Sequence, residues 1–382
     1  MNVLYIIGGE GRRHGSEIIA IDLLSVGKEN GVNYTVIVAN KGSVYDACIE
    51  LRIPCYVFPF TFYVYKEMSN KWLNIVKKHI WKTRADYLTR KAVKKIEKSI
   101  DMSSIDVIHT NLTRDLLGGI LSEKYSIPHI WHIQELFKAH YQLSFLKKNQ
   151  IEWMKQHANV FIAISNTVAQ QWVENGLPSE KVRVIYNGVD FSKFIPKIEY
   201  SYEIRLHLVM VGHIVPAKGQ EIIIKNLCKL PEEIRRNISL DCFGDGEKAY
   251  LKKLKALAEK NDVTLNLRGY NSNIASILKD YDIGINCSRG EGFGLSTVEF
   301  MAAGLCPVVA NTGANIELIE DGKSGFIFDI NNEEDFLSLI IQLFNNREIL
   351  SDIGKKARTV ALDNYAINKM QGEVFSAYRM II

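Results

Sequence analysis

Short apolar runs alternate with longer amphipathic stretches along almost the whole chain, and this alternation limits the folds that the chain can adopt. The pattern is typical of strand–helix–strand units that build a parallel sheet with helices on its faces. The expected strands are residues 3–7, 34–38, 55–58, 107–109, 129–132, 160–164, 207–211, 239–243, 264–267, 282–287, 307–310 and 325–328.

One interruption divides this pattern into two halves. Residues 186–190 read Tyr-Asn-Gly-Val-Asp, which favours a turn, and no clear periodicity follows up to residue 202. A length of 382 residues is enough for two domains. We therefore predict an α/β protein with two Rossmann-like, doubly wound parallel-sheet domains, residues 1–192 and 193–363. Ligands of such folds bind at the carboxyl ends of the strands, so we expect the domains to face a cleft.

Composition excludes several classes of protein. The chain is 47% hydrophobic and 24% charged, as a soluble globular protein is. It has no run of about 18 apolar residues for a membrane span, and its first residues read as a buried strand rather than a secretory signal. The six cysteines are scattered without a C-x-x-C pair, which predicts reduced core residues of a cytoplasmic protein without a metal site.

The segment from 289 to 311 carries the clearest chemistry. It follows an apolar run, opens with glycines at 290, 292 and 294, and continues as a helix that leads into a further apolar run. Free N–H groups at the start of such a helix favour a phosphate. Two carboxylates, Glu291 and Glu299, frame the segment. An alternative is that Ser296 and Glu299 form a capping box, in which Glu299 only satisfies the helix's own N–H groups.

This pair of glutamates and its context resemble the acidic signature of the family-4 retaining glycosyltransferases, which have the two-domain GT-B fold. The resemblance implies that Glu291 contacts the donor sugar and that Glu299 holds the ribose of the nucleotide. The residues that it places along the sugar and diphosphate are Gly292, Phe293, Gly294 and Leu295. It also implies that a last helix, residues 364–382, packs back on the first domain.

The glycine-rich segment 8–17 is open to two interpretations. It is one residue short of the dinucleotide fingerprint, and the second strand ends in Ala39-Asn-Lys41 without the acid that binds ribose. The NAD interpretation therefore fails. The segment resembles the glycine-rich loop of the family, which implies that the amides at Gly15 and Ser16 reach the donor phosphates. An ordinary strand-to-helix loop is the alternative.

Three further positions match the family. Lys218 lies where the family has a lysine on the diphosphate, whereas His213 replaces an arginine; an isolated lysine is otherwise usually a solvated one. His132, at a strand end, matches a histidine near the donor sugar and the acceptor, with a structural histidine as the alternative. Tyr270 matches the region near the nucleotide base, where it would stack or simply pack. The resemblance thus implies His132, Lys218 and Glu291 as catalytic residues, and Gly15, Ser16, His213, Tyr270, Gly292, Phe293, Gly294, Leu295 and Glu299 as donor-binding residues.

Metal participation is not expected. Asp280-Tyr-Asp282 reads as a D-x-D metal motif, but it lies between a helix and a buried strand, and we interpret it as a helix-end turn. No histidine cluster is present in the sequence. Fixed cations and helix amides would then stabilise the charge on the departing phosphate. We expect a retaining, metal-independent hexosyltransferase without a cofactor, which moves a sugar from a nucleotide-sugar to a lipid-linked or cell-surface glycan precursor.

Two alternatives remain open: a catalytically weak nucleotide-sugar-binding or scaffold subunit of the same fold, and a nucleotide-sugar isomerase. The binding or scaffold subunit remains an alternative because His213, in place of an arginine, brings no fixed charge to the diphosphate.

The first half of the chain is the basic half. Residues 1–192 hold 24 Lys and Arg against 18 Asp and Glu. The residues from 66 to 98 concentrate these cations and interleave them with Trp72, Ile80 and Trp81 at near-helical spacing. We predict peripheral contact between this segment and an anionic membrane on its inner face. A solvated helix whose apolar side packs on the sheet is the alternative. Nucleic acid is not an expected partner, since no motif that reads it is present.

Overall fold

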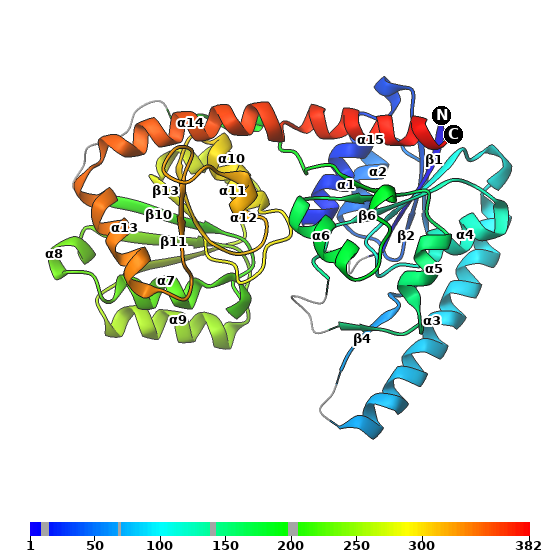
Figure 1. Cartoon of the computed structure of the whole chain (residues 1–382), viewed down its shortest axis with the longest axis horizontal. Coiled ribbons are helices and arrows are strands. Elements are labelled where there is room, and N and C mark those ends of the chain that lie inside the picture. The colour runs from blue at the N-terminus through cyan, green and yellow to red at the C-terminus, as the bar shows by residue number, and fades with distance from the viewer. Residues whose placement is uncertain (9–14, 68–69, 138–142, 198–204) are drawn as a thin grey trace. The chain divides into compact units, whose positions relative to one another are not determined.

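The computed structural model describes residues 1–8, 15–67, 70–137, 143–197 and 205–382. The chain forms two compact units, Met1–Tyr186 with Met370–Ile382, and Asn187–Lys369. The glycine-rich residues 9–14, which the sequence placed in a phosphate-binding loop, lie outside the described residues. Figure 1 shows the elements of both units.

The first unit is built on a seven-stranded parallel sheet. Its strands are β1 (Asn2–Ile7), β2 (Asn33–Val38), β3 (Cys55–Val57), β5 (Val107–Asn111), β6 (His129–Ile133), β8 (Val160–Ala163) and β9 (Val182–Val184). Their order is β3-β2-β1-β5-β6-β8-β9. The central strands β1, β5 and β6 are almost wholly buried, as a sheet covered on both faces requires.

Helices and one small ribbon complete the first unit. The helices are α1 (Gly15–Ser25), α2 (Ser43–Glu50), α3 (Lys71–Ser99), α4 (Leu117–Tyr125), α5 (Gln150–Gln156) and α6 (Asn166–Glu174). An antiparallel pair, β4 (Val64–Lys66) and β7 (Leu143–Phe145), forms a separate two-stranded sheet. The sequence analysis did not predict this ribbon or β9.

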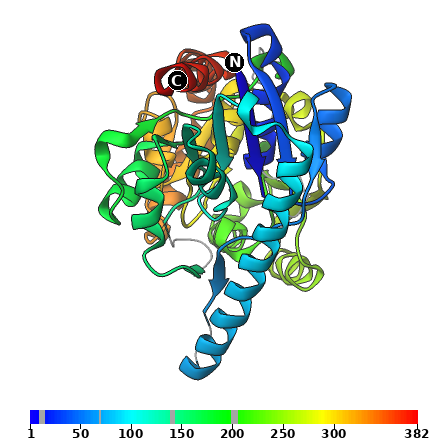
Figure 2. The same cartoon turned by 90° about the vertical axis from the view of Figure 1, so that its right-hand side faces the viewer.

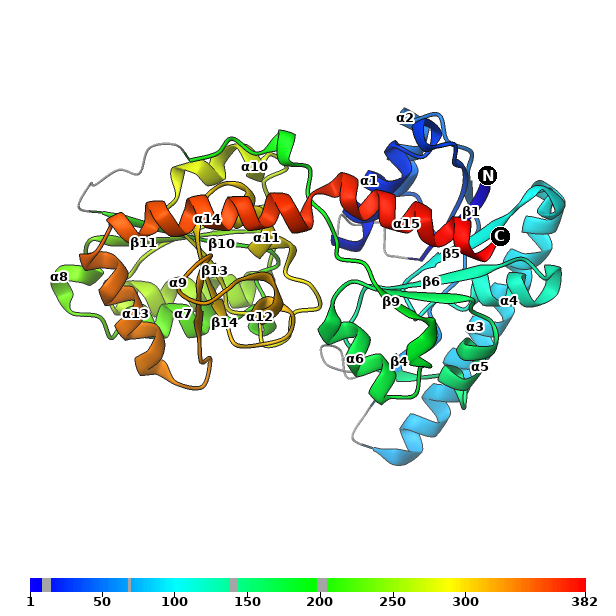
Figure 3. The same cartoon turned by 45° about the horizontal axis from the view of Figure 1, so that its top comes forward.

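The chain returns to the first unit through its last helix. Residues 364–382 were expected to form one helix, but the structure has α14 (Glu348–Tyr365) and α15 (Ile367–Ile381). The helices are separated at Ala366, whose φ of −69° and ψ of 139° are extended. In α15, Tyr378 is hydrogen-bonded through its hydroxyl to Nδ1 of His109 on β5 at 2.6 Å. Figure 3 shows α15 beside β1 and β5.

The second unit is a six-stranded parallel sheet between helices. Its strands are β10 (Leu206–Val211), β11 (Ile238–Phe243), β12 (Thr264–Gly269), β13 (Ile283–Asn286), β14 (Cys306–Ala310) and β15 (Phe326–Phe328). Their order is β12-β11-β10-β13-β14-β15. Its other helices are α7 (Gln220–Leu227), α8 (Glu232–Arg235), α9 (Lys248–Lys260), α10 (Ile274–Ile277), α11 (Leu295–Ala302), α12 (Asn315–Leu318) and α13 (Glu333–Asn345). The predicted α/β class with two parallel-sheet domains is confirmed.

Among the described residues, no helix combines the length and the hydropathy that a membrane span needs.

Candidate functional site

The loop between β13 and α11 is shaped by its last glycine. Gly294 is the N-cap of α11 and has a φ of 96°, a left-handed conformation that favours glycine. A Cβ atom at Gly294 would lie 2.9 Å from Cδ1 of Leu318 and 3.0 Å from Oδ1 of Asn315. No side chain caps the helix. The first N–H groups of α11 are therefore available to a ligand, and their dipole favours an anion.

The structure joins two of the predicted catalytic residues. Lys218 Nζ donates a hydrogen bond of 2.8 Å to Oε2 of Glu291, and both side chains are partly buried. The backbone holds the two segments together, because Arg289 N donates to the carbonyl of Ala217 at 2.9 Å. Gly219, directly after Lys218, has no room for a side chain, since its Cβ would lie 2.1 Å from the carbonyl oxygen of Cys287. An anion that binds Lys218 must compete with Glu291 for the ammonium group.

A turn after β14 fixes the backbone of Glu291. Ala314 N donates a hydrogen bond of 2.9 Å to the carbonyl of Glu291. A Cβ atom at Gly313 would lie 2.3 Å from the same oxygen, so only glycine allows this approach. Sequence reasoning missed Gly313, although a Thr-Gly pair that follows a buried strand is a turn signal.

Glu299 does not act as a helix cap. α11 begins at Leu295, so Ser296 lies inside the helix and cannot be its N-cap. Glu299 as a residue is partly exposed to solvent. The surrounding protein nevertheless raises its pKa to about 7 through loss of hydration. A half-buried acid that the helix does not use for its own capping is available to bind a ligand.

A buried cluster of polar side chains holds the first turn of α11 in place. Asn286 Nδ2 donates to Thr297 Oγ1 at 3.0 Å, and Thr297 Oγ1 donates to Asn315 Oδ1 at 3.3 Å. Asn286 Oδ1 also accepts the N–H of Ser288 at 3.2 Å. This cluster ties the end of β13 to α11 and α12. No sequence pattern predicted it, because its members are spread over three elements.

The other predicted donor-binding residues of the second unit lie at several places along its sheet. Phe293 is buried against Tyr365, with ring centroids 5.9 Å apart, so it packs rather than lines an open surface. Gly292 and Leu295 belong to the loop of Glu291 and to the first position of α11. His213 is exposed after β10, the strand next to β13, and its carbonyl accepts from Nε2 of Gln220 at 3.0 Å.

Tyr270 is exposed after β12. The strands β11 and β10 separate β12 from β13. Tyr270 therefore lies at the carboxyl edge of the same sheet as Glu291, but three strands along.

In the first unit, His132 ends up buried beside polar neighbours. It lies on β6 in register with Asn111 of β5, and burial lowers its pKa to about 3, which keeps the imidazole neutral. Neither ring nitrogen has a hydrogen-bond partner in the described structure. Asn111 Nδ2 donates to the carbonyl of Ser16 at 3.3 Å, which brings the start of α1, with Gly15, to the same edge of the sheet.

Asp115 is a candidate site residue that sequence reasoning missed. Its Oδ1 accepts the N–H of Leu117 at 2.9 Å, whereas Oδ2 has no partner in the described part of the chain. Burial raises its pKa to about 7. The available signal was its place just after a strand that ends in Asn111, since functional groups of parallel sheets collect there.

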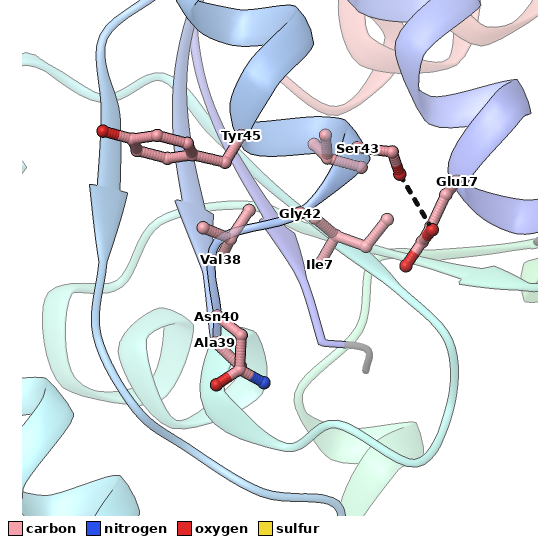
Figure 4. Close-up of a pocket in the computed structure, with 9 residues that line it drawn as sticks. Ile7, Glu17, Val38, Ala39, Asn40, Gly42, Ser43 and Tyr45 are labelled. Atoms are coloured by element: carbon pink, nitrogen blue, oxygen red, sulfur yellow. Dashed lines mark hydrogen bonds between the residues drawn. The ribbon is translucent and has the colours of Figure 1, made fainter. Parts of the chain in front are cut away.

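A small hollow lies beside the carboxyl ends of β1 and β2 (Figure 4). Glu17 points toward it and accepts a hydrogen bond of 3.0 Å from Oγ of Ser43. A carboxylate repels phosphate, so the lining of this hollow does not favour a phosphate.

The Asp280-Tyr-Asp282 sequence has a structural role. Asp282 Oδ1 accepts a hydrogen bond of 2.8 Å from the buried ammonium of Lys197, and Oδ2 accepts the N–H of His207 at 2.8 Å. Over the described ranges, no group of three or more potential metal-binding acids, histidines or cysteines occurs.

Known proteins resemble the chain over nearly its whole length. The model of Glycosyltransferase Family 4 matches residues 14–193, and the model of Glycosyl transferases group 1 matches residues 192–360. The uncharacterized glycosyltransferase MJ1178 of Methanocaldococcus jannaschii is 28% identical over 304 residues, 76% of this chain and 81% of that protein. The UDP-Gal:alpha-D-GlcNAc-diphosphoundecaprenol alpha-1,3-galactosyltransferase of Escherichia coli is 23% identical over 313 residues, 75% of this chain and 79% of that protein.

A solved structure shares the fold. Anabaena Alr3699/HepE in complex with UDP and glucose has a TM-score of 0.79 and 20% identity, with 100% of both chains covered. The two family matches leave only the ends of the chain uncovered. The chain is thus a member of the family-4, group 1 glycosyltransferases, with the GT-B fold.

Proposed function

We propose that the protein is a retaining hexosyltransferase that uses a nucleotide-sugar and needs no metal. The observation that carries this proposal is the contact of Lys218 with Glu291, 2.8 Å long, next to the uncapped start of α11. A cation and a set of N–H groups at one place suit a diphosphate, and an adjacent carboxylate suits the hydroxyls of a sugar.

Catalysis would come from positive charge aimed at the leaving group. When the bond between the anomeric carbon and the diphosphate breaks, negative charge builds on the phosphate. Lys218 and the N–H groups after Gly294 would stabilise that charge. Glu291 would hold the sugar in position. The acceptor would attack from the side on which the diphosphate leaves, with its proton passing to the leaving phosphate, so that the configuration is retained.

Glu299 would bind the ribose of the donor. The residue is partly exposed, and its side chain takes no part in the cap of α11. Charge-assisted hydrogen bonds from two ribose hydroxyls would offset the loss of hydration that raises its pKa. Uridine nucleotides are the first to test, because the Anabaena structure holds UDP.

The acceptor would bind the first unit. His132 and Asp115 place polar atoms without partners near the carboxyl ends of β6 and β5. Neutral imidazole and a carboxyl with a pKa of about 7 can each donate or accept a hydrogen bond with an acceptor hydroxyl. A lipid-linked acceptor is part of the proposal, supported by the diphosphoundecaprenol substrate in the name of the Escherichia coli relative, as is residence on the inner face of the membrane.

A nucleotide-release assay tests the proposal. The wild-type protein is incubated with a panel of UDP- and GDP-sugars, with and without lipid-linked glycan acceptors, in the presence of EDTA. We expect acceptor-dependent release of the nucleotide and a product with the anomeric configuration of the donor by NMR. Glu291→Gln should abolish release, whereas Glu334→Gln on α13 is the control.

The same assay separates the alternatives. Donor binding without turnover on any acceptor would mean a nucleotide-sugar-binding subunit, which the histidine at 213 favours because it lacks a fixed charge. Conversion of one nucleotide-sugar into another without an acceptor would mean an isomerase. Loss of activity in EDTA, with recovery on addition of a divalent cation, would contradict the metal-free mechanism.

A further inference from the structure

The first half of α3 presents apolar side chains to solvent. Trp72 is 79% exposed, Val76 is 54% exposed and Ile80 is 59% exposed. The exposed large apolar residues of this helix are Trp72, Leu73, Ile75, Val76, Ile80, Trp81 and Tyr87. Single exposed apolar side chains are common in soluble proteins, whereas a group of this size on one helix marks an interaction surface.

The row of Trp72, Val76 and Ile80 points away from the unit to which the helix belongs. Four buried residues define the inner face of α3: Ala85, Thr89, Ala92 and Ile96. At about 100° per residue, the row that contains Trp72, Val76 and Ile80 lies about 180° from that face. This exposed row therefore does not pack on the sheet, whereas Ala92 and Ile96, farther along the helix, belong to the core of the unit. The alternative that the sequence left open thus applies to the second half of α3 and not to the row in its first half.

The helix is nevertheless held firmly at its start. Asn70 is its N-cap and accepts the N–H groups of Trp72 at 3.0 Å and of Leu73 at 3.2 Å. Two turns later, Lys77 Nζ donates to the carbonyl of Lys66 on β4 at 2.9 Å. Figures 1 and 2 show the start of α3 extending beyond the seven-stranded sheet of its unit. The apolar row is thus an ordered, projecting surface.

The charge of the helix indicates what covers this surface. α3 carries ten Lys and Arg against two acids. Both acids are already paired, Asp86 with Lys82 and Glu97 with Lys124. Most of the cations are left without a carboxylate on their own helix. A second copy of the same helix would bring like charges together, which disfavours a dimer through this face.

We infer that the outer face of α3, with Trp72, Val76 and Ile80 at its centre, docks on an anionic lipid bilayer. The apolar row would enter the boundary between headgroups and acyl chains, where tryptophan is favoured. The lysines and arginines farther along the helix would contact anionic headgroups, each contributing an attraction that salt screens. Docking needs no glycosyl transfer, so it can be tested apart from the proposed function.

The experiment measures vesicle binding of the whole protein without a donor. Vesicles of phosphatidylcholine alone and of phosphatidylcholine with phosphatidylglycerol are compared by flotation, each at low and at high salt. We expect binding only to the anionic vesicles and weaker binding at high salt. The exposed Trp72, which belongs to the row, should become protected from quenching by aqueous iodide, whereas Trp131 and Trp172 are already buried.

A matched pair of variants locates the surface. Ile80→Glu should lower the affinity for anionic vesicles by about tenfold or more, since it removes an apolar group from the interface and adds a repelling charge. Ile49→Glu is the control, because Ile49 is also on a helix of the first unit and is 57% exposed. Circular dichroism checks that both variants fold.

Three results would overturn the inference. The first is equal binding of Ile80→Glu and Ile49→Glu to the anionic vesicles. The second is failure of the wild-type protein to bind under all four conditions. The third is a dimer by light scattering that Ile80→Glu dissociates, since it would assign the surface to a second copy of the chain.

Discussion

Replacement of Glu299 by glutamine should make the second unit more stable while it weakens nucleotide binding. The carboxyl of Glu299 has its pKa raised by burial from 4.5 to about 7. Such a carboxyl has a higher pKa in the folded protein than in the unfolded protein, so its protonated form favours folding. This stabilisation is fully present at a pH below the pKa of the unfolded protein, and it is lost as the pH rises through the pKa of the folded protein. At pH 8 the ionised carboxylate of Glu299 therefore lowers the stability of the folded protein.

The shift sets the size of the effect. Each pKa unit corresponds to about 1.4 kcal/mol, so the shift from 4.5 to about 7 represents at most about 3 kcal/mol. Glutamine must also lose hydration, which we take to offset about half of this gain. A net gain of about 1–2 kcal/mol should raise the melting temperature at pH 8 by about 2–6 °C. At pH 5 most of that difference should vanish, because wild-type Glu299 is then largely protonated.

Nucleotide affinity should move in the opposite direction. A charge-assisted hydrogen bond contributes about 1.5–3 kcal/mol, and glutamine keeps the shape but not the charge. We expect the dissociation constant of the nucleotide to rise by about tenfold. Calorimetric titration and thermal melts of Glu299→Gln at pH 5 and pH 8 measure both quantities. Glu334→Gln, an exposed residue of α13, controls for the loss of one negative charge. Unchanged affinity together with a lower melting temperature at both pH values would refute the assignment of Glu299 to the ribose.

Three other substitutions test separate features of the two units. Lys218→Ala should lower kcat by about 100-fold with a smaller effect on KM, because its charge is used as the diphosphate departs; the exposed Lys225 of α7, replaced by alanine, should leave turnover unchanged. His213→Ala should weaken diphosphate binding, because the imidazole can donate a hydrogen bond to phosphate; unchanged affinity in calorimetric titration would remove His213 from the site. Asp115→Asn should stabilise the first unit at pH 8 but not below pH 4, because burial raises the pKa of this carboxyl from 3.8 to about 7; a stability difference that does not change with pH in denaturant melts would contradict this.

The fold class could be predicted because its signal is local. Each strand of a doubly covered parallel sheet is apolar on both sides, so runs such as residues 3–7 and 207–211 are visible in the sequence, and the helices between them follow their own period. Element boundaries were less accurate. The basic segment from residue 66, with its near-helical spacing, becomes a helix only at Lys71 after the cap Asn70, because β4 occupies residues 64–66.

Candidate site residues were predicted only where a family motif covers them. Glu291 and Glu299 lie in a recognisable segment of the sequence. By contrast, Asp115 and Asn286 belong to no motif, and only their burial and their hydrogen bonds distinguish them.

The sequence by itself determined that this is a two-domain parallel α/β protein, with a glycine-rich loop before α11 and a strongly basic helix. Only the tertiary structure decided that Lys218 reaches Glu291, that Glu299 does not cap its helix, and that the apolar row of α3 faces solvent. The physical reason is that the hydrophobic pattern of a sequence shows only whether each side chain prefers apolar or aqueous surroundings. Which group provides those surroundings depends on contacts between residues far apart in the chain, and the sequence pattern does not contain that information.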